Sequence, residues 1–192
     1  MAIQINGNGT ITGISVGGLP NGIVDTDMLA ASAASPEKLG DGIIIQTSIV
    51  STANKVTVNS DGSYTDIITH NFTPKRSDSN LVYHVMFQCY CNNNGGYSNG
   101  VDYRILQDGN SIKEQSWGMY LNHASYQHDW YPQMNVIDRL ANIGTTNQIT
   151  FKMQGRRYQG STNSFQTEFG EDTKSGSAVG STIVWKIEEL SV

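Results

Sequence analysis

Three carboxylates near the C-terminus are the residues of this sequence that come nearest to a catalytic pair. Glu168, Glu171 and Asp172 lie close together in a stretch rich in glycine and serine. Paired carboxylates cleave glycosidic bonds, but this composition is also typical of a solvated loop, which we favour. The sequence contains neither a nucleophile elbow nor a phosphate-cradling glycine loop. We therefore predict a protein without enzymatic activity.

Histidines offer a second kind of chemistry. His123, His128 and Asp129 are close in sequence, and imidazole together with carboxylate suits zinc or iron. Their spacing matches no known ligand signature, and a loop histidine is usually a solvated polar residue. We therefore predict no metal and no other cofactor.

The segment 117–132 mixes aromatic rings with Asn, His, Gln and Asp. Flat rings supply contact area while polar groups fix orientation, which suits binding to a glycan or to a protein. Core or subunit-interface positions are an equally open interpretation for Trp117, Tyr120 and Trp130, whereas Tyr126 and His128 have polar neighbours and are expected to be exposed. The predicted receptor-binding residues are Trp117, Tyr120, Tyr126, His128, Trp130 and Tyr131.

Strands must position these residues, because apolar positions alternate along the chain from about residue 43. The clearest strand is 81–91, whose odd positions are apolar or aromatic. Its even positions are mixed, so that face is a candidate interface, with His84 and Met86 on it. Further strands are predicted at 101–107, 111–113, 133–140, 148–153 and 182–187. About eight such strands predict an all-β, antiparallel β-sandwich that is jelly-roll-like.

Turn residues between the strands predict two hairpins. Asp108-Gly109-Asn110 gives the strongest signal, and residues 59–63 predict a second hairpin between strands 55–58 and 64–72. Cys89 and Cys91 are two positions apart in a strand, so their side chains share one face and poorly suit a disulfide. We expect two reduced cysteines in the core or in an interface.

The first forty-odd residues differ from the rest of the chain in their pattern, because glycines interrupt short apolar pairs. Such a segment cannot bury a core alone. Residues 3–5 and 10–16 alternate and predict short strands that need a partner. Capping chemistry at 25–31 and 35–40 predicts one or two helical turns. We predict an arm, residues 1–42, and a head, residues 43–192. The predicted interface or anchoring residues of the arm are Ile3, Ile5, Ile11, Ile14, Val16, Leu19, Met28 and Leu29.

Composition narrows the range of partners. Charged residues make up only 15% of the chain, and the net charge of -5 comes without a basic cluster that would neutralise phosphates. The longest apolar runs, such as 43–45, are far shorter than the roughly 20 residues that span a bilayer, and the N-terminus does not resemble a signal peptide. We therefore predict no nucleic-acid partner, no membrane insertion and no secretion.

The arm resembles a segment common in tail-fibre and related structural proteins of tailed bacteriophages, marine and cyanobacterial ones among them. The resemblance rests on NGNGTITGISVGGLPNG at residues 6–22, VDTDMLA at 24–30 and SPEKL at 35–39. The head resembles more loosely the β-sandwich tips of such fibres, through residues 71–75, 108–110 and 181–188.

This resemblance implies a homotrimeric virion protein, assembled in the host cytoplasm, whose arm contacts other virion proteins and whose head binds a glycan or protein of the host surface. In such a trimer, symmetry would bring the His84 side chains together if they faced the axis, which we state as a hypothesis. We favour a tail fibre or fibre tip. The alternative is a capsid decoration or head-fibre protein, and a glycan-depolymerising tailspike is a more distant one.

Overall fold

The computed structural model describes residues 4–5, 11–12, 40–58, 62–94, 98–120, 127–158, 167–172, 179–180 and 182–192. The chain divides into two units, Met1–Leu39 and Gly40–Val192. In the first unit, β1 (Gln4–Ile5) pairs antiparallel with β2 (Ile11–Thr12), and Ile5 lies opposite Ile11. These two predicted strands therefore pair with each other. The predicted helical turns lie outside the described residues, except for Gly40. The same holds for six predicted interface residues: Ile3, Ile14, Val16, Leu19, Met28 and Leu29.

In the second unit the described residues form strands and contain no helix. Their order along the chain is β3 (Ile44–Thr52), β4 (Val56–Val58), β5 (Thr65–Phe72), β6 (Asn80–Asn94), β7 (Ser98–Gln107), β8 (Asn110–Tyr120), β9 (Gln127–Trp130), β10 (Gln133–Leu140), β11 (Ile149–Arg157), β12 (Thr167–Phe169), β13 (Glu171–Asp172), β14 (Val179–Gly180) and β15 (Ile183–Leu190).

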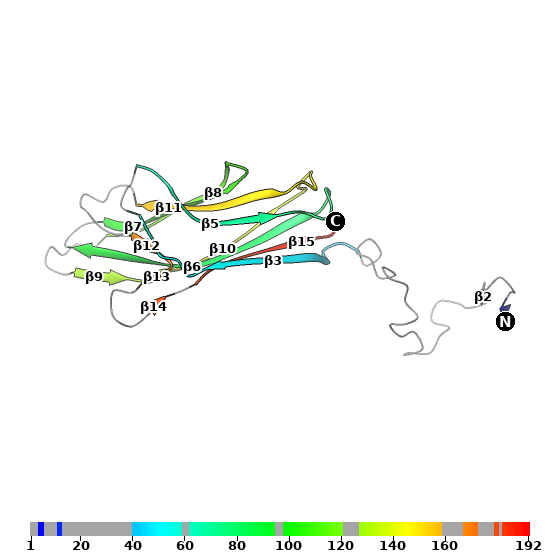
Figure 1. Cartoon of the computed structure of the whole chain (residues 1–192), viewed down its shortest axis with the longest axis horizontal. Helices are drawn as coiled ribbons and strands as arrows, with labels where there is room; N and C mark the ends of the chain where they lie inside the picture. Colours follow the sequence, from blue (N-terminus) through cyan, green and yellow to red (C-terminus); the bar gives the residue numbers. More distant parts are fainter. Residues whose placement is uncertain are drawn as a thin grey trace. The chain divides into compact units, whose positions relative to one another are not determined.

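Two sheets face each other across the core (Figure 1). The larger sheet has the order β3-β15-β6-β10, and β4, β12 and β9 extend it at one end. The smaller sheet has the order β5-β11-β7-β8. If the eight long strands are lettered B to I along the chain, these orders are B-I-D-G and C-H-E-F, the arrangement of a jelly roll. The predicted antiparallel, jelly-roll-like sandwich is confirmed.

The core forms where the inward positions of both sheets meet. The odd positions of β6 from Leu81 to Cys91 are buried, as the alternation predicted. Three residues of β11 and three of β15 join them in one cluster: Ile149, Phe151, Met153, Ile183, Trp185 and Ile187. Full burial of one such apolar side chain stabilises the fold by about 1.5–3 kcal/mol.

Cys89 and Cys91 are both buried and neither forms a disulfide, as predicted. Burial disfavours the thiolate, so the pKa of Cys91 rises to about 12 and that of Cys89 lies well above its usual value. Since the thiolate is the reactive form, both side chains act as small apolar core residues.

One predicted hairpin is confirmed and the other is wrong. Asp108 and Gly109 both have positive φ angles, 47° and 85°, between the paired strands β7 and β8, as a tight hairpin turn requires. Strands β4 and β5 are not paired with each other, because β4 pairs with β12 and β5 with β11. Turn residues favour a reversal of the chain, but burial of apolar faces decides which strands pair.

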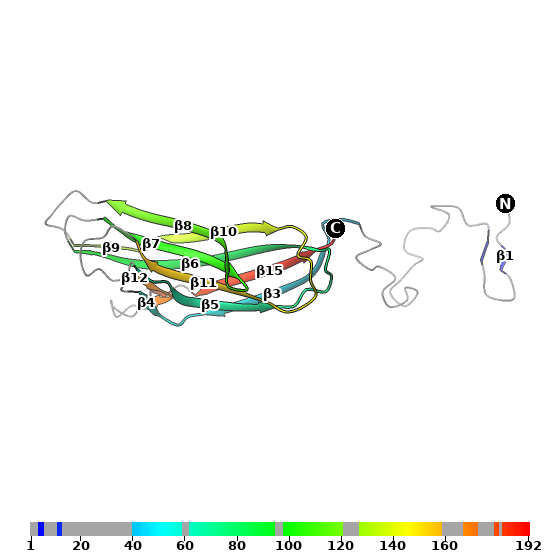
Figure 2. The same cartoon turned by 90° about the horizontal axis from the view of Figure 1, so that it is seen from above.

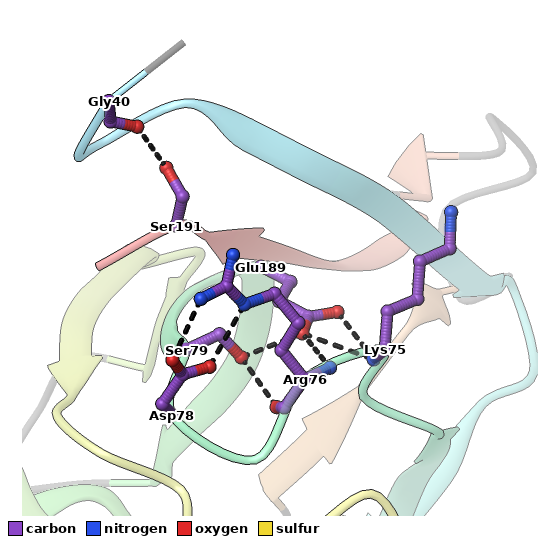
Figure 3. A network of polar contacts seen from close by, with 7 residues as sticks. All are labelled: Gly40, Lys75, Arg76, Asp78, Ser79, Glu189 and Ser191. Atoms are coloured by element: carbon purple, nitrogen blue, oxygen red, sulfur yellow. Dashed lines mark hydrogen bonds and ion pairs between the residues drawn. The ribbon is translucent and has the colours of Figure 1, made fainter. Parts of the chain in front are cut away.

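A buried carboxylate connects three segments at one end of the sandwich (Figure 3). Glu189 of β15 has no exposed surface. It accepts hydrogen bonds from the backbone N–H groups of Lys75 at 2.9 Å and Arg76 at 2.9 Å, from the Ser79 hydroxyl at 2.6 Å and from the Gln46 side-chain amide at 2.6 Å. These four donors replace the hydrogen bonds to water that the carboxylate loses when it is buried.

The same end holds the place where the chain enters the head. The Ser191 hydroxyl donates to the Gly40 carbonyl at 2.7 Å (Figure 3) and accepts from the Ile43 N–H at 3.0 Å. The Gly42 N–H donates to the Ser191 carbonyl at 2.9 Å, and the Ser191 N–H donates to the Ile43 carbonyl at 2.9 Å. Residues 40–43 are therefore fixed to the C-terminal end of β15.

Replacing Glu189 by Ala should lower the free energy of unfolding by about 3 kcal/mol, because each buried donor left unsatisfied costs about 1–3 kcal/mol. The matched control is Asp78→Ala. Asp78 is largely exposed in its 2.7 Å ion pair with Arg76, so its loss should lower stability far less than the loss of Glu189. Urea unfolding of both variants measures the difference, and equal losses would contradict this account of Glu189.

His70 is a buried histidine of β5 at the edge where β5 faces β3. Its Nε2 atom lies 2.8 Å from the Ser48 hydroxyl of β3, and its ring packs edge-on against Trp185. No part of the side chain is exposed. Because burial disfavours the charged ring, the pKa of His70 lies below its usual value of 6.5.

Stability should therefore decrease as the pH falls below about 6.5, because the unfolded chain then binds a proton at His70 that the folded chain does not. The slope contributed is at most about 1.4 kcal/mol per pH unit. In urea unfolding, His70→Gln should flatten the dependence of the unfolding free energy on pH between pH values of about 6.5 and 5. The depressed pKa values of Asp66, Asp78 and Asp138 act below this window. An unchanged slope would disprove the assignment to His70.

Candidate functional site

The head has two ends with different contents. Its proximal end, defined here by Gly40, Asn80 and Ser191, is where the chain enters the head and where β15 ends. Its distal end is defined by Asn94 of β6, which lies opposite Gln127 of β9. β6 runs between the two ends (Figures 1 and 2). Its 15 residues span about 46 Å at about 3.3 Å per residue.

Four of the predicted receptor-binding residues, Trp117, Tyr120, His128 and Trp130, lie in β8 or β9. Trp117 of β8 is half-buried and packs against the core, so it fits the alternative of a core residue. The ring of Tyr131 packs against that of Tyr90 in a tilted arrangement, with ring centroids 5.3 Å apart. For Tyr120 in β8, and for His128 and Trp130 in β9, the structure describes the backbone. Tyr126 lies outside the described residues. The receptor role of all six stays a prediction.

A second candidate site is the outer face of β3, β15, β6 and β10, which we call the apolar face. Among the described residues, the large hydrophobic side chains that are exposed are Ile43, Ile44, Ile49, Met86, Ile137 and Val192. Four of them lie on strands of the larger sheet and none on the smaller sheet. Exposed apolar groups on one side of the molecule make that side a candidate interaction surface.

His84 and Met86, predicted as interface residues, both lie on the apolar face. Met86 is 45% exposed and His84 is half-buried beside it on β6. An open hollow of about 440 Å³ adjoins Met86, between β6, β10 and the residue that precedes β15. Its lining residues are Met86, Phe87, Gln88, Gln133, Met134, Asn135 and Thr182. Their role at an interface between subunits stays a prediction.

The outer face of the smaller sheet is polar. The Tyr64 ring contacts the guanidinium carbons of Arg104 at 4.1 Å and Arg156 at 4.5 Å. Its hydroxyl donates to Glu114 at 2.6 Å. Burial, and then the bond to this carboxylate, raise the pKa of Tyr64 to about 12. Arg156 also pairs with the buried Asp102 at 3.0 Å, so opposite charges are balanced across this face.

Glu168, one of the three carboxylates near the C-terminus, does not lie in the solvated loop that composition suggested. Glu168 lies in β12, is 1% exposed and forms an ion pair with Lys55 at 3.1 Å. The buried Glu168 carboxylate is thus held by a partly exposed lysine, which ties β12 to the segment before β4. For Glu171 and Asp172 the structure describes only the backbone of β13. The described residues contain no group of His, Cys, Asp and Glu that could hold a metal ion.

Sequence reasoning missed Ile49 and Ile137 as surface residues. Each has an apolar neighbour that points inward, Val50 and Val136. Two adjacent apolar residues in a strand must face opposite sides, so one of them is exposed or covered by a partner. This signal was present in the sequence at both positions. The Tyr64 cluster had no comparable signal, because its members come from four strands or their margins.

Comparisons with known proteins identify no family. No family model and no curated protein matches the chain. Solved structures to which it is similar include the insecticidal delta-endotoxin Cry8Ea1 from Bacillus thuringiensis, at 14% identity and a TM-score of 0.33, covering 72% of this chain and 20% of that one. The infectious bursal disease virus VP2 subviral particle matches at 10% identity and a TM-score of 0.36, covering 78% and 42%.

Dimeric latent PorU from Porphyromonas gingivalis matches at 9% identity and a TM-score of 0.34, covering 78% of this chain and 13% of that one. The chain thus spans less than half of the length of each of the three proteins. Likenesses with TM-scores this low carry no argument about function. Among the described residues, no helix is long and apolar enough to cross a membrane.

Introducing a charge on the apolar face should weaken association between copies. Met86→Glu places a carboxylate on an exposed position, so the fold should keep its melting temperature while the mass in solution falls toward 21.0 kDa. Thr69→Glu is the matched control, because Thr69 is exposed on β5 of the other sheet, opposite Lys152. Light scattering coupled to size exclusion measures both. Equal masses for the two variants would rule out this face as the interface.

Proposed function

We propose that this protein is a homotrimeric fibre or fibre-tip component of a bacteriophage virion, which attaches the particle to a host cell surface and has no enzymatic activity. One observation carries the proposal. The chain enters the head at Gly40, while the strands that flank the aromatic segment meet at the opposite end of β6. A protein anchored by its arm would therefore hold this segment away from the anchor.

The sequence of the arm supports a virion role. Its glycine-rich motif at residues 6–22 resembles tail-fibre segments, and its partner would be another virion protein. The jelly-roll head supports the same role in a general way, because this fold is used in viral capsid proteins and lectins. A fold does not by itself define a function, so the assignment depends on the arm and on the distal end.

The ligand of the distal end is proposed to be a glycan or a protein of the host surface. Tyr131 is half-buried on Tyr90, so part of this aromatic pair is available to a partner. Aromatic side chains flanked by amides bind sugar rings and peptide surfaces by the same combination of area and directed hydrogen bonds. Since the chain carries a net charge of -5, a neutral ligand meets less repulsion than an anionic one.

Replacing Tyr126 and His128 together by Ala should reduce binding of the purified protein to host cells at least tenfold. The loss of about 1.4 kcal/mol that this represents is typical of two interface side chains. Tyr131 is left in place because its ring packs on Tyr90. The control, Lys75→Ala with Ser111→Ala, changes two exposed residues away from the distal end, one between β5 and β6 and one at the start of β8, and should bind normally.

Unchanged binding by the first variant, at an unchanged melting temperature, would refute the receptor surface. Antibody labelling of whole particles then separates the favoured location from its alternative. Signal at the tail would support a tail fibre, and signal on the capsid would support a decoration or head-fibre protein. Release of reducing sugar from host polysaccharide by the purified protein would overturn the assignment as a non-enzyme.

A further inference from the structure

Four residues form one row straight across the apolar face. Ile49 of β3 lies opposite Lys186 of β15, Lys186 lies opposite His84 of β6, and His84 lies opposite Ile137 of β10. The two isoleucines stand on the two outermost strands of the row and are 60% and 54% exposed. Both edges of the face are thus apolar at the same height along the strands, while its middle carries a cation and an imidazole.

Three flat sheet faces arranged around a threefold axis meet along their edges. Rotation about an axis parallel to the strands does not shift a residue along that axis. The β3 edge of one copy therefore meets the β10 edge of the next with Ile49 and Ile137 at the same level. Ile49 of one copy would therefore contact Ile137 of its neighbour. The middle of each face, with Lys186 and His84, would point toward the axis.

The dimensions of the face fit this arrangement. Four strands at about 4.8 Å spacing make a face about 19 Å wide, and three such faces in a triangle place the axis about 5.5 Å from each backbone plane. Stacked sheets lie about 10 Å apart, which leaves about 5 Å for the side chains of each sheet. The side chains of the apolar face therefore have the length that fills the centre of the triangle.

The two edges also differ in shape, as a closed ring requires. A ring of three needs two different surfaces on each copy that fit each other. Ile49 is the most exposed of the large hydrophobic side chains among the described residues. The hollow of about 440 Å³ is lined by Met86 and Asn135, two residues along the strands from His84 and Ile137, and it lies near the opposite edge. A protruding residue at one edge and a hollow near the other supply the two halves of the contact.

Charge on the apolar face permits copies of an acidic protein to approach each other. Lys186 and Glu188 form an ion pair at 3.0 Å within one copy, so the lysine that would face the axis is already neutralised. Arg139 is exposed on the same face, opposite Val82. The sum of these charges is not negative, although the whole chain carries a net charge of -5. This face therefore contributes little to the repulsion between copies.

We infer that the occupant of the apolar face is a second copy of this chain, with Ile49 at the β3 edge of each subunit packed on Ile137 at the β10 edge of the next. This inference rests on the homotrimer of the proposed function and deepens it. It specifies a heterologous contact, in which the two edges of the face meet and identical residues do not.

Cysteine cross-linking of the full-length protein tests this contact. Within one copy Ile49 and Ile137 are three strands apart, about 14 Å at about 4.8 Å per strand, which is beyond the roughly 7 Å limit for a disulfide. In Ile49→Cys/Ile137→Cys, a bond can therefore form only between copies. The native Cys89 and Cys91 are buried and stay unreactive.

Mild oxidation of this double variant should convert most of the protein into a covalent trimer on non-reducing gels. Each single variant should stay monomeric on the gel, because identical residues do not meet. The matched control, Ile49→Cys/Ser116→Cys, has its second cysteine at an exposed position of β8 in the other sheet and should give no trimer band. Light scattering on the unoxidised samples reports the mass independently of the cross-link.

The outcomes separate the contact from the proposed function. A covalent trimer from the double variant alone would support the inference. A trimeric mass without the cross-link would overturn this contact and leave the trimer intact, with another segment, such as the arm, on the face. A covalent dimer from the Ile49→Cys single variant would overturn it in favour of a twofold contact. A monomeric mass would overturn both the contact and the proposed homotrimer.

Discussion

The rest of the head depends on the pairing of β6, because this strand has partners on both sides: along 81–88 and 91–94 on one side, and along 80–86 and 89–91 on the other. β10 and β9 follow each other along one side, and β15 and β12 follow each other along the other. Its inward positions reach the core from Leu81 near one end to Cys91 near the other. A strand with the same buried alternation but half this length would leave β9 without its partner and β12 paired with β4 alone.

The sequence predicted those parts of the fold whose signal lies within one strand or one turn. Alternation predicted the core positions of β6, β11 and β15, and positive-φ residues predicted the β7–β8 hairpin. The pairing of β4 with β12 was not predictable in this way, because the two strands are separated by more than a hundred residues and β12 has only three. Glu168 was misjudged for the same reason, since its partner Lys55 is equally distant along the chain.

The candidate site, too, was predictable only where the signal lies within one strand. The mixed even positions of β6 indicated an interface, and His84 and Met86 lie on the apolar face. The sequence could not show that β3 and β10 border the same face, because that follows from the order of strands in the sheet. Nor could it show that the other outer face is closed by balanced charges around Tyr64. The contrast between the two faces emerges only when strand order is known.

The attachment of residues 40–43 to Ser191 has a mechanical consequence. Tension applied at residue 40 would reach the head at residues 40–43, just before β3 and beside the end of β15. A pull along β3 away from the distal end loads the β3–β15 ladder in shear, so its hydrogen bonds resist together instead of opening one after another. The bonds of Ser191 to Gly40, Gly42 and Ile43 lie first in this path. The junction is thus built to carry load along the strands.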